Sequence, residues 1–438
     1  MEADKTTLKD LSLFEAEEGH SVLNRLDFAR TSNGREQLRK NLSTPLQSLA
    51  AIEAIQQTIA CIQSKRQHWP MQISNGTIMV IERLYATSID ALPRRVTKLD
   101  AFTYKIFHNA DYSLVKYSGI HCFDLIKGMK AMVTLFADES YPAPLKNIIN
   151  DVGRMVSEPH LAIVDKFAKM SEAPIAKQLE LTWFLRHQYK NQMLTLINHY
   201  AQLDAWWAMA EAMQQYGLVF PELVQSNEPF VEIDGLYHLL LATPIPYNVR
   251  LSRNTHFLFL TGANMAGKST FIKSVGVATF LAHIGMGVPA RSMRLSVFDG
   301  LLSNINVADN IAKGESYFYN EVQRIKATIQ KINDGRKWLI LIDELFKGTN
   351  VQDAMKCSTA VIEGLLKIKN ALFILSTHLY EIGDELKKYP NIQFNYFETS
   401  VQDGQLHFSY QLREGISNDR LGYLILKREG VVKLLEDL

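Results

Sequence analysis

Residues 261–270, Thr-Gly-Ala-Asn-Met-Ala-Gly-Lys-Ser-Thr, have the residue types and spacing of a loop that binds phosphate. Gly262 and Gly267 let the backbone curl so that its N–H groups face phosphate oxygens at the positive end of a helix. Lys268 adds a charge at the β- and γ-phosphates, and Ser269 supplies a hydroxyl to Mg²⁺. The alternative is a glycine-rich turn that binds no nucleotide. The candidate ATP-binding residues of this loop are Gly262, Ala263, Asn264, Met265, Ala266, Gly267, Lys268, Ser269 and Thr270.

An acidic pair and a histidine follow two later apolar runs. Asp343 and Glu344 end the run Trp-Leu-Ile-Leu-Ile, and Thr377-His378 follow Ala-Leu-Phe-Ile-Leu-Ser. At the end of a strand, Asp343 can hold Mg²⁺ directly or through water, and Glu344 can activate the attacking water as a general base. His378 can reach the γ-phosphate and sense its loss. A histidine in this place can also be a purely structural residue.

The three elements in this order predict an ATP-hydrolysing α/β domain of the ABC-like type, in which two ATP sites form between two subunits. A serine-bearing segment of one subunit then caps the γ-phosphate on the other. The candidate segment is Gly-Glu-Ser-Tyr-Phe-Tyr-Asn-Glu-Val, where Gly314 and Ser316 precede a helix expected from Tyr317. The alternative for Ser316 is an ordinary N-cap serine.

Short apolar runs alternate with helical stretches in the second half of the chain, which predicts an α/β sheet with parallel strands. The expected strands are His-Phe-Leu-Phe-Leu-Thr before the phosphate loop and the two runs that precede Asp343 and His378. Near the end, residues 392–401 and 404–412 flank Gln-Asp-Gly and predict an antiparallel hairpin.

Residues 1 to about 225 have helical periodicity almost throughout. Leucines at helical spacing predict a helix over residues 20–42 with a break at Thr-Ser-Asn-Gly, residues 31–34. Residues 175–216 contain no Gly and no Pro, and Gly217 is a plausible C-cap. One continuous helix here would be roughly 60 Å long, which is typical of an arm or lever. The alternative is two helices with an unmarked kink.

These segments together resemble the MutS family of DNA mismatch-repair ATPases. Thr-Gly-Ala-Asn-Met-Ala-Gly-Lys-Ser-Thr is similar to that family's phosphate loop. The segment around Ser316, Phe318 and Glu321 is similar to its Ser-Thr-Phe-x-x-Glu motif, and Gly348-Thr349 match the end of its Asp-Glu segment. Residues 31–46 resemble its core-domain entry, and residues 413–431 resemble its C-terminal helical element.

The resemblance implies a mainly helical core and lever domain over residues 1–228. An α/β P-loop ATPase domain over residues 229–438 would follow, with a C-terminal helical element that pairs subunits. It also implies Mg²⁺-dependent ATP hydrolysis at paired sites in a homodimer that acts on DNA, in concert with other repair proteins. The family's mismatch-reading N-terminal domain is expected to be missing. A nucleotide-driven switch that engages another protein, with no direct DNA role, is the alternative.

Several residues depart from the family pattern. Ala263 stands in place of a proline and Ala266 in place of a glycine, and neither change is expected to abolish phosphate binding. Phe346 replaces a glycine after the acidic pair. The family's adenine-stacking phenylalanine is missing before the loop, and Tyr247 is the candidate substitute.

Composition sets outer bounds on these expectations. The chain has 438 residues and a formal net charge of +1, which excludes a globally basic nucleic-acid coat but allows a local basic groove. Three scattered cysteines predict reduced thiols. The first residues show no secretory pattern, and the longest nearly uncharged run, residues 275–288, is too short to span a bilayer. The sequence therefore predicts a cytoplasmic protein with no membrane partner.

Overall fold

The computed structural model describes residues 1–14, 20–89, 92–94, 96–137, 140–305, 317–402, 405–417 and 431–436. They form two compact units. The first unit comprises residues 1–25, 44–53 and 215–438, and the second comprises residues 26–43 and 54–214. The sequence predicts a single boundary at residue 228, whereas both compact units are discontinuous along the chain. Two N-terminal segments belong to the same unit as the C-terminal half.

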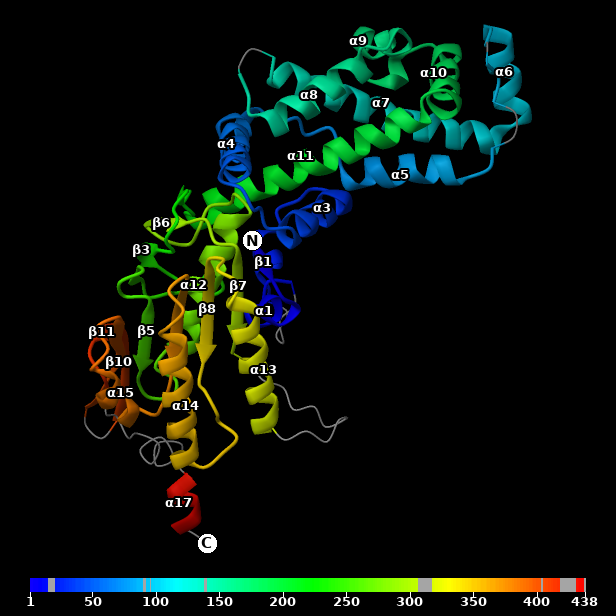
Figure 1. Ribbon diagram of the computed structural model, residues 1–438. Helices are drawn as coiled ribbons and strands as arrows, with labels where there is room; N and C mark the ends of the chain where they lie inside the picture. The colour runs from blue at the N-terminus through cyan, green and yellow to red at the C-terminus, as the bar shows by residue number, and fades with distance from the viewer. Residues whose placement is uncertain are drawn as a thin grey trace. The chain divides into compact units, whose positions relative to one another are not determined.

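A seven-stranded sheet forms the centre of the first unit (Figure 1). Every neighbouring pair is parallel except the last, in which β10 and β11 form the expected antiparallel hairpin. The three apolar runs predicted as parallel strands are confirmed as β5, β8 and β9. In spatial order the strands are β1 (Glu2–Ala3), β7 (Gly300–Asn304), β8 (Trp338–Asp343), β9 (Ala371–Ser376), β5 (Phe257–Thr261), β10 (Ile392–Gln402) and β11 (Gln405–Glu414).

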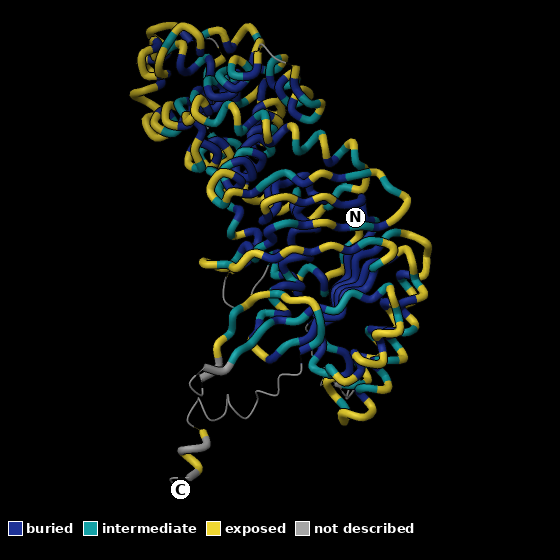
Figure 2. Tube along the Cα trace, turned by 90° about the vertical axis from the view of Figure 1, so that its left-hand side faces the viewer, coloured by how far each residue is buried: buried dark blue, intermediate teal, exposed yellow. Residues whose placement is uncertain are grey.

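Helices cover both faces of this sheet. Ile340 and Ile342 of β8 pack in one apolar cluster with α13 (Tyr317–Ile332), α14 (Val351–Leu365) and α15 (Glu381–Leu386). Leu341 points to the opposite face, as strand alternation requires, where it lies against Gly276 of α12 (Lys268–His283). Leu11, which follows α1 (Lys5–Asp10), packs at the same place. Figure 2 shows the strands of this sheet buried beneath exposed loops and helices.

A second sheet of four strands lies in the same unit, in the order β2-β6-β3-β4. Burial alternates along β4, where Tyr247, Val249 and Leu251 are buried and the two residues between them are exposed. This alternation gives β4 one buried apolar face and one exposed polar face. The strands are β2 (Glu222–Val224), β3 (Val231–Leu236), β4 (Tyr247–Leu251) and β6 (Ser292–Ser296).

The second unit is helical, as predicted. Its longest helices are α7 and α11, and Figure 1 shows α5, α8 and α10 lying alongside them. None of the described helices is long and apolar enough to cross a membrane. The helices with residues in this unit are α2 (Val22–Leu26), α3 (Ser32–Ser43), α4 (Leu49–Lys65), α5 (Asn75–Ala86), α6 (Lys98–Phe107), α7 (Asn109–Leu135), α8 (Ala143–Val156), α9 (Ile163–Lys166), α10 (Ile175–His187) and α11 (Lys190–Tyr216).

The prediction of a single helix over residues 175–216 is wrong, and the alternative of two helices is confirmed. α10 ends at His187 and α11 begins at Lys190. The carbonyl of Phe184 accepts from the N–H groups of both Gln188 and Tyr189, at 2.9 and 3.1 Å, which closes the helix. Tyr189 is buried, and its hydroxyl donates to the Met155 carbonyl at 2.6 Å. A tertiary contact therefore sets the kink without any Gly or Pro.

The helical break expected at residues 31–34 lies earlier, at residues 27–31. The carboxylate of Asp204 on α11 causes this placement, because it accepts from the backbone N–H groups of Arg30 and Thr31 and from the Thr31 hydroxyl. Gly34 then lies inside α3, directly against Asp204. The glycine is therefore required for the close approach of α3 and α11, and it does not interrupt the helix.

We expect Gly34→Ala to destabilise the protein by about 2–4 kcal/mol, since the fully buried Asp204 would lose hydrogen bonds. A Cβ at residue 34 would lie 2.1 Å from Asp204 Oδ2. Urea unfolding measures the change. Gly364→Ala is the matched control, because a Cβ at this helical position meets nothing within 4 Å. Equal midpoints for the two variants would contradict the packing argument.

Candidate active site at the phosphate loop

The predicted phosphate loop connects β5 to α12 in the context that the motif requires. Gly262 and Gly267 have φ angles of 139° and 105°, values that favour glycine, and Gly267 is the N-cap of α12. Met265, at φ 68°, is 63% exposed at the tip of the loop. The loop thus presents backbone to a cavity of about 650 Å³. Of the predicted loop residues, Ala263, Asn264, Met265, Gly267, Lys268, Ser269 and Thr270 line this cavity, and Ala266 is buried.

Lys268 lies folded inside the loop. Its ammonium donates to the carbonyls of Gly262 and Ala263, at 2.7 and 2.9 Å, and lies 3.4 Å from His378 Nδ1. Burial lowers the pKa of Lys268 to about 8, although the carboxylates of Glu344 and Asp343 act in the opposite direction. The ammonium charge of Lys268 is therefore held at the centre of the loop by two backbone carbonyls. A phosphate oxygen can replace these carbonyls as the hydrogen-bond acceptor.

Ser269 and Asp343 meet although they are far apart in sequence. The Ser269 hydroxyl donates to Asp343 Oδ2 at 2.5 Å, and the Ser376 hydroxyl donates to the other carboxylate oxygen. Hydroxyl and carboxylate oxygens are ligands that Mg²⁺ prefers, and Mg²⁺ commonly takes only one or two protein ligands beside substrate phosphates. The donor set therefore fits the predicted metal.

Glu344 lies between His378 and Lys347. Its carboxylate pairs with His378 Nε2 and, at 3.1 Å, with the ammonium of Lys347. Burial raises the pKa of Glu344, but the hydrogen bond and charge of His378 and the charge of Lys347 outweigh it and lower the pKa to about 2. Glu344 is therefore an ionised hydrogen-bond acceptor beside the phosphate loop, and it lines the same cavity.

The backbone after β8 is held in an uncommon conformation. Glu344 and Phe346 have φ angles of 63° and 59°, in the left-handed region that non-glycine residues rarely adopt. Two contacts from α13 secure this turn: the buried carboxylate of Glu321 accepts from the N–H groups of Lys347 and Gly348, at 3.2 and 3.3 Å. The rings of Phe318 and Phe346 also pack with centroids 5.6 Å apart. The phenylalanine that departs from the family pattern is therefore an anchor for the turn.

We expect Glu321→Gln to lower the ATP turnover rate by about tenfold to a hundredfold, with ATP affinity within twofold of the wild-type value. A carboxamide has one acceptor oxygen, so one buried N–H of the turn loses its partner and Glu344 shifts. Steady-state turnover and equilibrium ATP binding, measured separately, test this. Glu385→Gln, on the exposed side of α15, is the control. Weaker ATP binding with unchanged turnover would contradict this role for Glu321.

Two tyrosines border the cavity. Tyr247 is buried, with Phe271 and Phe397 edge-on to its ring at 5.5 and 5.6 Å, so it offers a ring edge and a hydroxyl to the cavity. Tyr410 on β11 is 40% exposed and lies over Gly267. Sequence reasoning missed Tyr410, because only the pairing of the hairpin with β5 brings it to the loop. It also missed Ser376, because only the pairing of β8 with β9 places this residue opposite Asp343.

The predicted Ser316 and the preceding Gly314 lie outside the described residues. The structure therefore brings together Lys268, Ser269, Asp343, Glu344 and His378, which were predicted from three separate segments. Ser316 as a cap on a γ-phosphate stays a prediction.

Comparison with known proteins gives a consistent family assignment. The model of MutS domain V matches residues 258–434. The "DNA mismatch repair protein MutS" of Lactococcus lactis subsp. cremoris SK11 is 28% identical over 254 residues, which are 57% of this chain and 30% of that protein. The proteins of the same name from Petrotoga mobilis and Streptococcus suis are also 28% identical, over 279 and 264 residues. These matches cover 33% and 31% of the two relatives, so the chain corresponds to about a third of their length.

Proposed function

Because this chain is a member of the MutS family with MutS domain V in its C-terminal half, we propose that it binds ATP and hydrolyses it with Mg²⁺. The observation that carries the proposal is the meeting of Ser269 with Asp343, and of Glu344 with His378, beside one phosphate loop. A glycine-rich turn without nucleotide chemistry would not need these four side chains together. The same residues therefore argue for hydrolysis as well as binding.

Each residue has a distinct part in the proposed reaction. The loop N–H groups and Lys268 bind the β- and γ-phosphates, and Ser269 and Asp343 hold the metal. Mg²⁺ held there would neutralise negative charge that develops on the phosphates during transfer. Glu344 accepts a hydrogen bond from the attacking water and orients it. His378 is placed to exchange its Glu344 contact for a γ-phosphate oxygen and so to report the loss of that phosphate.

The proposed working form is a homodimer with two composite ATP sites. Ser316 would cap the γ-phosphate bound by the partner subunit. A mixture of Lys268→Ala and Ser316→Ala chains tests this sharing, since each mixed dimer holds one site with both defects and one intact site. Partial recovery of activity on mixing is expected, and activity equal to the mean of the separate variants would argue against shared sites.

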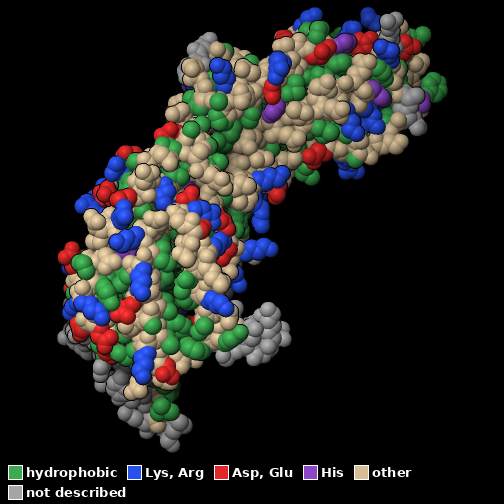
Figure 3. All heavy atoms as spheres, in the orientation of Figure 1, with side chains coloured by type: hydrophobic (Ala, Val, Ile, Leu, Met, Phe, Trp, Pro, Cys, Tyr) green, Lys and Arg blue, Asp and Glu red, His purple; other side chains and the backbone are tan. Residues whose placement is uncertain are grey.

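We further propose that ATP turnover acts on DNA, in mismatch repair or related processing of DNA structures. The relatives named for mismatch repair support this proposal. Their similarity to this chain covers about a third of their own length. Figure 3 shows Lys and Arg interspersed with Asp and Glu on the visible face, with no broad block of one sign. A DNA contact would therefore use local basic side chains, and it would weaken with salt.

ATPase rate measured against mismatched, perfect, forked and junction duplexes at two salt concentrations tests the DNA proposal. Stimulation by one DNA structure, lost at high salt, is the expected outcome and would identify the substrate class. An equal rate with every DNA, together with binding no stronger than that of a neutral control protein, would contradict it.

A protein-directed switch is the second candidate, and α6 favours it. Leu99, Phe102, Ile106 and Phe107 are 55–78% exposed on or at the end of this helix. Exposed apolar side chains at helical spacing are typical of a surface that binds another protein. The Trp206 and Trp207 pair does not add to this surface, because Trp206 is buried and Trp207 lies against Trp69. An ATPase rate that is equal with every DNA would favour this candidate over the DNA proposal.

A further inference from the structure

The helix α6 has apolar side chains on two faces, and only one of these faces is covered. Ala101 and Tyr104 are buried in the apolar cluster that joins α6 to α7 and α10. Leu99, Phe102 and Ile106 lie on another face of the helix, and each of them is more than half exposed. A helix that is apolar on all sides is normally buried on all sides. The exposed face of α6 is therefore a candidate for contact with another molecule.

Leu99, Phe102 and Ile106 form one continuous surface, the α6 stripe. Their spacing of three and then four residues places them on successive turns of the same face. Phe107, at the end of the helix, is the most exposed of these apolar side chains and extends the surface. Figure 1 shows α6 beside α10 at one end of the helical unit. Exposed apolar surfaces that are contiguous in this way mark sites of interaction on folded domains.

Two lysines border the α6 stripe along one side. Lys98 is four residues before Phe102 and Lys105 is three residues after it, so both lie next to Phe102 on the helix surface. Both lysines are exposed, and neither forms an ion pair with a described residue. The other side of the stripe carries Thr103, which is exposed and uncharged. The stripe therefore has one cationic edge and one neutral edge.

The carboxylate of α6 does not neutralise this cationic edge. Asp100, the one acidic residue of the helix, accepts from the backbone N–H and the hydroxyl of Thr97, at 2.9 and 2.7 Å, and so caps the N-terminus. Asp100 is also two positions from Lys98, a spacing at which side chains on a helix do not face each other. Within the described chain, the ammonium groups of Lys98 and Lys105 are thus left to pair with an acidic group of another molecule.

We propose that the α6 stripe binds an amphipathic helix of a partner protein, which has acidic residues along one edge of its apolar face. Helices dock on apolar surfaces through side chains spaced by three, four and seven residues, which is the spacing of the stripe. Lys98 and Lys105 are seven residues apart, so the acidic residues of the partner would lie two turns apart.

Two other occupants fit the α6 stripe less well. A second copy of this helix would bring lysines and no free carboxylate to the cationic edge. Single-stranded nucleic acid binds through aromatic rings on which its bases stack, whereas Leu99 and Ile106 are aliphatic. The inference is independent of ATP hydrolysis, and it rests on the protein-directed candidate, for which it specifies the kind of partner.

Fluorescence anisotropy of two labelled synthetic peptides, titrated with the full chain in the absence of nucleotide, tests the proposal. Both peptides are helices of about 18 residues with leucines at the spacing of the stripe; one has glutamates beside the leucines and the other has lysines. The wild-type protein should bind the glutamate peptide about tenfold more tightly, and salt should reduce the difference. Phe102→Gln should weaken this binding about tenfold, because Phe102 is the central side chain of the stripe. Lys98→Glu together with Lys105→Glu should reverse the preference between the peptides.

Two control variants make the same chemical changes elsewhere on the helical unit. Met79→Gln removes an exposed apolar side chain from α5, and Lys146→Glu reverses an exposed charge on α8. Both should leave the affinity for each peptide within twofold of the wild-type value. Because no nucleotide is present, a failure of the proposed ATP hydrolysis would not alter this result.

Three outcomes would overturn the inference. The first is equal binding of the two peptides by the wild-type protein, or unchanged binding in Phe102→Gln. The second is a loss of DNA binding in Phe102→Gln while peptide binding stays the same, which would assign the α6 stripe to nucleic acid. The third is a concentration-dependent dimer of the wild-type protein that Phe102→Gln abolishes, which would assign the stripe to a second copy.

Discussion

Glu344→Gln is expected to lower the ATP turnover rate by about 10²–10⁴-fold, the usual contribution of a positioned general base. The carboxylate is ionised and fixed by His378 and by Lys347, 3.1 Å away, so it is ready to accept a proton or a hydrogen bond from water. A carboxamide has nearly the same shape but carries no charge and cannot take a proton. ATP binding should stay within about threefold of wild type, because Lys268 and Ser269 are unchanged.

Single-turnover hydrolysis and equilibrium ATP binding together measure this effect. Size-exclusion chromatography with ATP should also show a persistent dimer, since bound ATP is no longer consumed. Glu385→Gln, at an exposed position on α15, is the control for the same chemical change. An unchanged turnover rate in Glu344→Gln would remove Glu344 from the reaction and would leave the phosphate loop as a binding element only.

Lys268→Ala is expected to weaken ATP binding by about tenfold to a hundredfold. A hydrogen bond to a charged group contributes about 1.5–3 kcal/mol, and Lys268 is the loop's only ammonium. The variant also frees the carbonyls of Gly262 and Ala263, which now accept from it. Because the loop then loses an internal contact and a phosphate contact together, turnover should fall with affinity.

Titration with a fluorescent ATP analogue gives the affinity directly. Lys273→Ala, in the second turn of the same helix and half-buried, is the matched control and should bind ATP normally. Thermal unfolding of both variants checks that the loop change is local. Normal ATP affinity in Lys268→Ala would contradict nucleotide binding at this loop.

The sequence by itself determined the candidate site residues, because each of them belongs to a short contiguous pattern. A glycine-rich loop after one strand, an acidic pair after a second and a histidine after a third are all local signals. Parallel strands bring their carboxyl ends to one edge of a sheet, so the order of the patterns already implied that Asp343, Glu344 and His378 would meet the loop. The hairpin of β10 and β11 was predictable for the same local reason.

Only the tertiary structure decided the features that join distant segments. The kink at Gln188 and Tyr189 depends on a buried tyrosine, and the approach of α3 to α11 depends on Gly34 against Asp204. The addition of β1 to the edge of the sheet, and the reach of Glu321 to the turn after Glu344, join residues that no local pattern relates.

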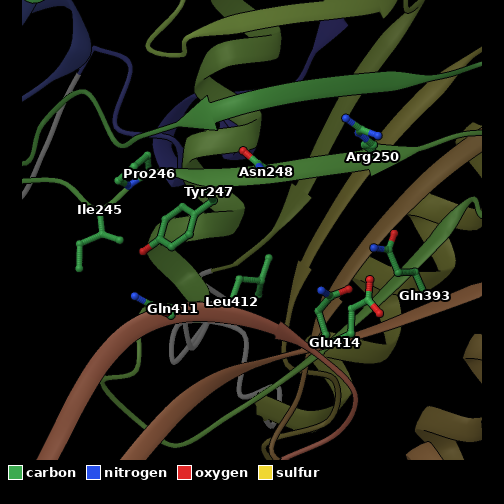
Figure 4. Close-up of a pocket in the computed structure, with 10 residues that line it drawn as sticks. Ile245, Pro246, Tyr247, Asn248, Arg250, Gln393, Gln411, Leu412 and Glu414 are labelled. Atoms are coloured by element: carbon green, nitrogen blue, oxygen red, sulfur yellow. The ribbon is translucent and has the colours of Figure 1, made fainter.

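The recess between β4 and the hairpin of β10 and β11 belongs to the same class of feature (Figure 4). One wall comes from β4 and the other from the hairpin, which lies more than a hundred residues further along the chain. Local propensity and periodicity report on neighbours within one helical turn or one strand, and they carry no information about which distant backbone will lie opposite. The residue pattern of the loop was therefore readable in the sequence, whereas the contacts that position Glu344 arise only when the chain packs.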